Sequence, residues 1–252
     1  MRSAPGAERA AALPFPEVAL LAKRGAVALL PVGSTEAHGP HLPLDTDVVI
    51  AEGVCDRAAG RLAAKGVPSL VFPALPYGVT EFAKAFAGTV SLPAAAFREL
   101  ALGVVRGIAA HGFTRIGLVN HHLEPAHFTA LHEVVKTLGA EGLKVSLADH
   151  RKKPIAPLLG EEFCRGGSHA GFYETSLVLA CDASRVQDAV RRGLPKLDIN
   201  LAQKIREGAQ DFAACGGPDA YFGDPASASA EEGERLLSIL ADATVEALLA
   251  LP

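Results

Sequence analysis

The chain has 252 residues, of which 49% are hydrophobic and 21% are charged, and its formal net charge is −4. The sequence has no extended basic run, which argues against nucleic acid as a partner because such binding needs clustered Lys and Arg. Its longest apolar runs fall short of the ~18 residues that a membrane span requires, so we expect no membrane partner.

The predicted elements alternate between strand and helix. Apolar segments bounded by turn residues predict strands, and segments with Ala and Leu at helical spacing predict helices. The predicted strands are Ala26–Pro31, Ser69–Leu75, Arg115–Val119 and Lys144–Ala148. The predicted helices are Val48–Lys65, Pro93–His111, Ala126–Gly139, Glu174–Cys181 and Glu231–Leu251. Because strands separated by helices form βαβ units, we predict a single α/β domain over residues 1–252, with three αβα layers and a mostly parallel sheet.

The cysteines and the N-terminal residues indicate the cellular compartment of the protein. Cys55, Cys164, Cys181 and Cys215 show no CxxC or other zinc-binding spacing. The first nine residues carry an acid and lack the apolar region of a signal peptide. We therefore expect reduced thiols and a cytoplasmic protein.

The strongest functional signal follows the first predicted strand. Glu36 and His38 are separated by one residue, and Asp47 lies nine residues after His38. Residues 32–47 contain two glycines and two prolines, which predicts a shaped loop rather than a helix. Two carboxylates and an imidazole form a ligand set for zinc or manganese. The alternative is an ordinary polar loop, in which residues 45–47 cap the next helix.

A second signal follows the third predicted strand. Asn120, His121, His122 and Glu124 bring several ligand-type residues together directly after an apolar segment. We predict metal contact for His122 and Glu124, and expect His121 to face the substrate. Glu124 could instead be a first-turn acid that the helix dipole favours, and either histidine could be a core residue.

Polar residues also follow the second and fourth predicted strands. Tyr77–Glu81 comes after the second strand, and Asp149 and His150 come after the fourth. Ligands of an open parallel sheet bind beyond the carboxyl ends of its strands. The occurrence of polar clusters after these strands therefore indicates a ligand-binding site.

Two later segments remain open to more than one interpretation. In Gly167–Ser176, His169 lies among small residues and Glu174 follows at the start of a predicted helix. These two side chains could be a general acid/base with a supporting carboxylate, or a plain helix cap. Residues 193–229 are rich in Gly, Asp, Ala and Ser, and could cover an active site or form plain surface.

Together these stretches resemble the creatininase family, which includes creatinine amidohydrolase and related amide-cleaving or deformylating enzymes. Gly33–Asp47 (Gly-Ser-Thr-Glu-Ala-His-Gly-Pro-His-Leu-Pro-Leu-Asp-Thr-Asp) is similar to the family's first signature. Ala87–Leu92 resembles its Pro-Gly-Thr-(Ile/Val)-Ser-Leu segment, and His169–Ser176 resembles its His-Ala-Gly-x-x-Glu-Thr-Ser element. The resemblance extends roughly from Leu30 to Ser176 and implies a creatininase-like fold.

The resemblance also implies a centre of two divalent ions, zinc or manganese or both. The implied ligand sets are Glu36, Asp47 and His122 for one ion, and His38, Asp47 and Glu124 for the other. Asp47 would bridge the ions, and Glu174 would be a ligand or would orient one. The expected catalytic residues are His169 and Glu124. A water bridging the ions would attack the carbonyl carbon, and His169 would pass a proton to the departing nitrogen.

The pocket residues depart from the family pattern. His121 stands where the family has Gly, and Pro125 where it has Asn, at the end of the third predicted strand. The chain has no Trp, whereas creatininase closes its pocket with tryptophans. These departures favour a small polar substrate other than creatinine, which could be cyclic or carry a carboxylate. The residues expected to contact it are Tyr77, Gly78, Glu81, Lys84, His121 and Tyr173.

The leading interpretation is therefore a metal-dependent amidohydrolase that cleaves a C–N bond other than a peptide bond. An alternative enzyme would use the same metal centre to open a cyclic ketone at a C–C or C–O bond. A non-catalytic metal-containing binding protein is a third possibility, against which the presence of His169 weighs. Members of the family commonly form hexamers, so we expect a homo-oligomer.

Overall fold

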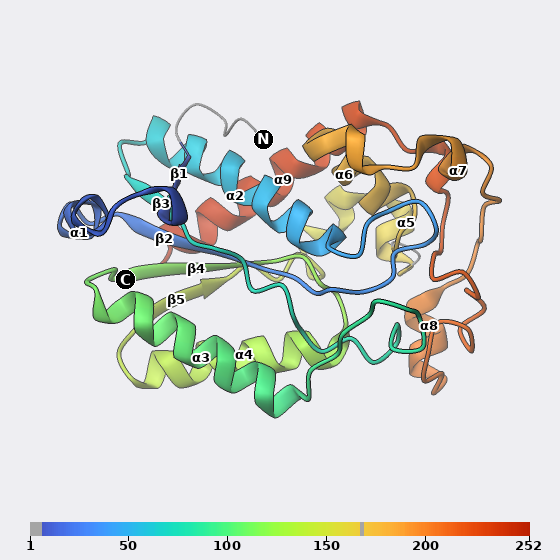
Figure 1. Cartoon of the computed structure of the whole chain (residues 1–252), viewed down its shortest axis with the longest axis horizontal. Coiled ribbons are helices and arrows are strands. Elements are labelled where there is room, and N and C mark those ends of the chain that lie inside the picture. The colour runs from blue at the N-terminus through green and yellow to red at the C-terminus, as the bar shows by residue number, and fades with distance from the viewer. Residues whose placement is uncertain (1–6, 167–168) are drawn as a thin grey trace.

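Parallel strands form a central sheet in the computed structural model, which describes residues 7–166 and 169–252 (Figure 1). The sheet order is β1-β3-β2-β4-β5. The bounds are β1 Glu8–Arg9, β2 Val27–Val32, β3 Ser69–Val71, β4 Arg115–Asn120 and β5 Lys144–Leu147. Gly167 and Ser168, which begin the predicted Gly167–Ser176 segment, lie outside the described residues.

Strand β2 lies in the middle of the sheet and is buried along its whole length. Val27 and Leu29 pack into the hydrophobic cluster on one face of the sheet. Ala28 and Leu30 pack into the cluster on the other face, since successive side chains of a strand point to opposite sides. Burial on both faces explains why this segment is a continuous apolar run in the sequence.

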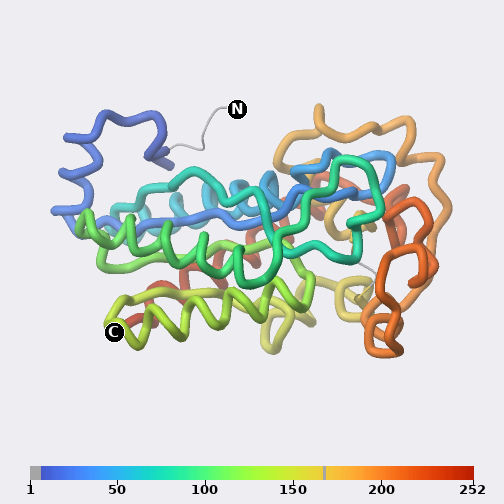
Figure 2. The backbone as a smooth tube through the Cα atoms, turned by 60° about the horizontal axis from the view of Figure 1, so that its bottom comes forward, coloured from blue at the N-terminus to red at the C-terminus, as the bar shows by residue number. Residues whose placement is uncertain are grey.

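Helices cover both faces of the sheet and complete three layers (Figures 1 and 2). One layer contains α2 (Thr46–Ala64), α6 (Phe172–Asp182) and α9 (Ala230–Leu249). The other contains α3 (Ala94–Ala110) and α4 (Pro125–Ala140). The predicted α/β fold, with its mostly parallel sheet between helical layers, is confirmed.

The second predicted strand is shorter than expected. β3 ends at Val71, and Pro73 soon follows, which has no N–H for a ladder hydrogen bond. Leu75 rejoins the sheet only through a single bridge to Val32. The sequence analysis also missed β1 and α1 (Phe15–Lys23), which precede the first predicted strand.

The remaining described helices are short. They are η1 Ala10–Ala12, η2 Ala156–Leu159, α5 Glu161–Cys164, η3 Ala183–Arg185, α7 Asp188–Arg192, α8 Leu201–Arg206 and η4 Pro225–Ser227. The irregular segment 193–229 contains α8 and η4. No described helix combines the length and apolarity that a membrane crossing requires.

The direction of the chain across the sheet reverses between β2 and β4. After β2 the chain passes through α2 to β3 on one side, and after β4 it passes through α4 to β5 on the other. Such a reversal opens a crevice beyond the carboxyl ends of the strands, where ligands of open α/β sheets bind. The loops after β2 and β4 therefore lie where a site is expected.

Candidate metal centre

Five buried ligand-type side chains converge beyond the carboxyl ends of β2 and β4. Glu36 and His38 lie on the loop after β2, and His122 lies on the loop after β4. Asp47 and Glu174 come from the first turns of α2 and α6, where the helix dipole favours a carboxylate. Each of the five is at most 3% exposed.

The first group of ligand atoms comes from Glu36, Asp47 and His122. Nδ1 of His122 lies 3.2 Å from Oε1 of Glu36 and 3.0 Å from Oδ2 of Asp47. Nε2 of the same ring lies 2.7 Å from the carbonyl oxygen of Val79, to which it can donate a hydrogen bond. That hydrogen bond would leave Nδ1 as the nitrogen free to act as a ligand.

The second group comes from His38, Asp47 and Glu174. Nε2 of His38 lies 3.5 Å from Oδ1 of Asp47 and 3.6 Å from Oε2 of Glu174. The same nitrogen is buried and has no hydrogen-bond partner among the described residues. Because Oδ1 of Asp47 faces His38 and Oδ2 faces His122, this carboxylate belongs to both groups.

The spacing of these atoms fits divalent ions. Ligand atoms held about 2.1 Å from a tetrahedral ion lie about 3.4 Å from one another. The nitrogen–oxygen distances within the two groups run from 3.0 to 3.6 Å. Imidazole and carboxylate ligands suit zinc and manganese, and an unpartnered buried nitrogen facing carboxylates is the arrangement that a cation would complete.

The charge of the cluster leads to the same conclusion. Burial lowers the pKa of His38, but the carboxylates of Asp47, Glu174 and Glu36 outweigh this effect and raise it to about 10. Burial raises the pKa of Glu174 to about 8, although His38 opposes the shift. Buried carboxylates are costly unless they are paired or coordinate a metal. Bound divalent ions would neutralise the carboxylates without protonation of His38 or Glu174.

Hydroxyl groups hold two of the carboxylates in place. Ser34 Oγ donates a hydrogen bond of 2.8 Å to Oδ2 of Asp47. Thr80 Oγ1 donates to Oε2 of Glu36. Such outer partners orient metal ligands and tune their affinity. The sequence analysis overlooked both hydroxyls, although they lie within the polar stretches that follow β2 and β3.

His169 lies at the edge of the cluster. Its Nδ1 is 3.9 Å from Oε1 of Glu36, and its ring centroid is 4.4 Å from that of His38. Burial, reinforced by the charge of His38, lowers the pKa of His169 to about 4. The next residue, Ala170, has a φ of 51°, and its N–H donates a 2.7 Å hydrogen bond to Glu174. This tight turn brings His169 and Glu174 to the same site.

Glu124 lies outside the ligand groups found among the described residues. Its carboxylate oxygens accept hydrogen bonds from the backbone N–H groups of Glu81, at 3.1 Å, and Phe82, at 3.3 Å. Burial raises the pKa of Glu124 above its ordinary value. In the second group, the structure has Glu174 where the sequence analysis expected Glu124.

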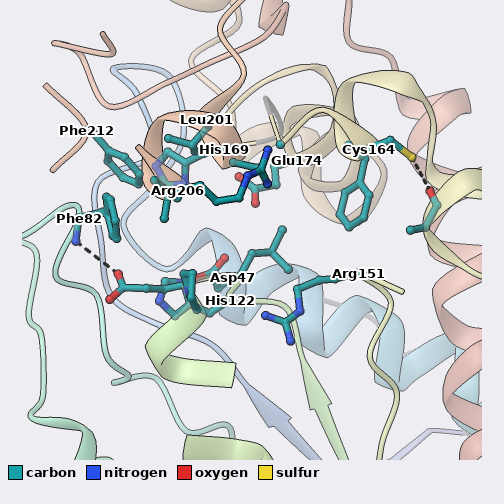
Figure 3. Close-up of a pocket in the computed structure, with 18 of the residues that line it drawn as sticks. Asp47, Phe82, His122, Arg151, Cys164, His169, Glu174, Leu201, Arg206 and Phe212 are labelled. Carbon is teal, nitrogen blue, oxygen red and sulfur yellow. Dashed lines mark hydrogen bonds and ion pairs between the residues drawn. The ribbon is translucent and has the colours of Figure 1, made fainter. Parts of the chain in front are cut away.

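The cluster opens into a cavity of about 520 Å³. Figure 3 shows His169, Glu174 and Arg206 on one side, with Asp47, His122 and Arg151 facing them. Phe82, Phe163 and Phe212 add aromatic surface, and the basic residues of the wall are Arg151, Lys153 and Arg206. Helix α8 also contributes Leu201, so part of the irregular segment 193–229 does border the candidate site.

The residues expected to contact substrate do not line this cavity. They are Tyr77, Gly78, Glu81, Lys84, His121 and Tyr173. Glu81 and Lys84 form an exposed ion pair of 2.8 Å, and Tyr77 is 44% exposed. His121 and Tyr173 are each 1% exposed, with stacked rings 5.6 Å apart. These residues do follow strands or adjoin the site in sequence, but local pairing and packing direct their side chains elsewhere.

The basic wall was not among the sequence candidates. Arg151 and Lys153 follow Asp149 and His150 at the end of β5, so the polar cluster after the fourth strand was an available signal. Arg206 lies on α8, which has six residues, too few for a helical period to be recognised.

Comparisons with known proteins identify relatives over most of the chain. The model of the creatininase family, described as creatinine amidohydrolase, matches residues 11–248. A mycofactocin precursor peptide peptidase from Mycobacterium ulcerans (strain Agy99) is 35% identical over 222 residues, covering 85% of this chain and 81% of the relative. A creatinine amidohydrolase from Pseudomonas putida is 32% identical over 244 residues, covering 88% of each chain.

Solved structures named as creatininases have the same fold. One named for manganese superposes with a TM-score of 0.71 and 26% identity, covering 96% of this chain and 97% of that one. A mutant described as the Zn–Zn type superposes with a TM-score of 0.71 and 27% identity, covering 95% and 96%.

Proposed function

Because this chain belongs to the creatininase family, we propose that it is a divalent-metal-dependent amidohydrolase. The reaction would be hydrolysis of a C–N amide bond in a small polar substrate. We propose two ions per chain, zinc or manganese. One would be held by Glu36, Asp47 and His122, and the other by His38, Asp47 and Glu174.

The position of Asp47 carries the proposal. Its two carboxylate oxygens face two different histidines, at 3.5 Å for His38 and 3.0 Å for His122. A carboxylate shared in this way is the usual bridge of a two-metal hydrolytic centre. The unpartnered Nε2 of His38 supports the second position independently.

The protein's own residues would supply the proton transfers. Divalent ions in this site would polarise the carbonyl group and lower the pKa of a water molecule. Glu124 is a candidate base, since its carboxylate lines the cavity and burial raises its pKa toward neutrality. His169 is the candidate donor to the departing nitrogen, because its ring borders both the cavity and Glu36.

A peptide bond is the second candidate for the scissile bond. The cavity of about 520 Å³ lies within the range that accommodates ligands as large as a short peptide. Three phenylalanines in its wall offer contacts for an apolar side chain. The relatives named as mycofactocin precursor peptide peptidases favour the same class of bond.

Metal analysis of the purified protein tests the proposal. We expect about two zinc or manganese ions per chain by plasma mass spectrometry, with loss of occupancy in Asp47→Asn. The metal-loaded protein should hydrolyse members of a panel of amides, lactams and short peptides. Absence of metal after reconstitution, or failure to cleave any member of that panel, would overturn it.

The His169→Ala variant distinguishes a metal-dependent hydrolase from a metal-containing binding protein. A hydrolase should lose turnover in this variant while its metal content is kept. A binding protein should show no turnover in either form and unchanged ligand affinity. The homo-hexamer suggested by the family resemblance also remains a proposal, which sedimentation of the metal-loaded protein would test.

A further inference from the structure

Two cations at the mouth of the cavity are free to bind a ligand. Arg206, on α8, and Lys153, after β5, both line the cavity and are exposed. Among the residues that the structure describes, no carboxylate lies within 4.0 Å of either cationic group. The other arginine of the cavity lining, Arg151, is paired with Asp149 at 2.8 Å.

The side chain of Arg206 faces the candidate metal centre across the cavity. Figure 3 shows Arg206 extending along the wall that holds His169 and Glu174, opposite Asp47 and His122. An unpaired cation beside a catalytic cleft attracts and orients an anionic ligand. A guanidinium group binds a carboxylate in a planar, bidentate manner, which fixes the direction of the ligand as well as its charge.

We propose that Arg206, assisted by Lys153, binds a carboxylate of the substrate and so sets the end of the molecule that points out of the cavity. This inference rests on the proposed amidohydrolase function and names its substrate class: an amide that carries a free carboxylate. Phe82 and Phe212 line the same cavity and would contact an apolar group of the ligand.

Recognition of the substrate's charge would then lie in a part of the chain that the sequence did not suggest. The sequence suggested Lys84 for this role, but Lys84 is paired with Glu81 and lies outside the cavity wall. Arg206 belongs to the irregular segment 193–229, so specificity would depend on a part of the chain without regular periodicity. Differences in that segment would then change the substrate without changing the metal centre.

Binding of a matched pair of peptides tests the inference. The probes are acetyl-Gly-Phe with a free carboxylate and the same peptide with a terminal amide, titrated calorimetrically into zinc-loaded protein. A Glu124→Gln background keeps the probes from being consumed. The free acid should bind about tenfold tighter than the amide, and the difference should shrink as salt is raised from 50 to 500 mM.

The variants assign this preference to specific residues. Arg206→Gln should remove most of the preference, Lys153→Gln should reduce it, and Arg206→Lys should keep part of it. Lys204→Gln is the matched control, since Lys204 lies on the same helix but pairs with Glu207 and does not line the cavity. It should leave the preference unchanged.

The outcomes separate this inference from the proposed function. Equal binding of the two peptides, or a preference that persists in Arg206→Gln, would overturn the role of Arg206, even if amides are cleaved. The second result would mean that the metal ions bind the carboxylate. A preference that depends on Arg206, without cleavage of any amide by the metal-loaded wild type, would support the recognition site and refute the hydrolase.

Discussion

The hydroxyl of Ser34 donates a 2.8 Å hydrogen bond to Oδ2 of Asp47, the same oxygen that lies 3.0 Å from His122. Ser34 and Asp47 are both buried, at 0% and 1% exposure. The hydrogen bond therefore fixes the orientation of the carboxylate that the two ligand groups share. Ser34 itself contributes no atom to either group, so its role can be tested apart from metal ligation.

The Ser34→Ala substitution should weaken metal binding without abolishing it. Loss of an outer partner of a metal ligand typically costs about 10–100-fold in affinity. Competition against a chelator of known zinc affinity would measure the change. Thr129→Ala is the control, because the Thr129 hydroxyl bonds only the Pro125 carbonyl on exposed α4 surface. Equal affinities for Ser34→Ala and wild type would contradict the role given to Ser34.

Glu36→Gln and Glu124→Gln should have different effects on metal content. Glu36 supplies a ligand atom to the first group, so its substitution should lower occupancy. Glu124 is held by the N–H groups of Glu81 and Phe82, so Glu124→Gln should keep its metal and lose turnover by about 100-fold or more, typical of a lost general base. Metal analysis and amide hydrolysis on the same samples would measure both effects. Loss of metal in Glu124→Gln would instead favour the ligand role that the sequence resemblance implied.

The contrast between Glu124 and Glu174 shows how far the sequence could predict the site. The positions of polar residues after strands indicated which loops would meet, and Glu36, His38, Asp47 and His122 do converge. Which carboxylate turns toward His38 depends on local geometry that the sequence does not contain. The left-handed turn at Ala170 directs Glu174 inward, whereas backbone donors hold Glu124 at the cavity wall.

The fold was more predictable than the cavity wall. Segments such as β2 and α3 have clear apolar patterns because packing on the sheet requires them. The residues of the cavity wall follow no such apolar pattern in the sequence. Arg206 lies on a helix of six residues, and Arg151 stacks on the Phe128 ring, 3.3 Å from its centroid, a contact between segments far apart in the sequence.

The close approach of α6 and α9 predicts a strong effect at Gly233. A Cβ atom at this position would lie 1.9 Å from the Ser176 carbonyl oxygen, which is backbone and cannot turn aside. Gly233→Ala should therefore lower the free energy of unfolding by at least ~2 kcal/mol through forced separation of the helices. Gly103→Ala, in the interior of α3 with open space around it, should raise it by ~0.5–1 kcal/mol. Urea unfolding of both variants would measure these changes, and a neutral Gly233→Ala would mean that the two helices can move apart.

Asp149 should make stability depend on pH. Burial raises the pKa of this carboxyl, but hydrogen bonds from Arg151 and Lys152 outweigh burial and hold the pKa well below its ordinary value. A carboxyl whose pKa is lower in the folded state stabilises the protein above its unfolded pKa of ~3.9, and that contribution is lost as pH falls through the folded value. The free energy of unfolding of Asp149→Asn, measured with urea, should therefore be ~1 kcal/mol below that of wild type at pH 7. This gap in free energy should narrow below about pH 4. Glu133→Gln, an exposed change on α4 outside the described ion pairs, should show no such gap at either pH. A gap for Asp149→Asn that stays constant from pH 7 to pH 3 would mean that Asp149 acts through packing rather than through its charge.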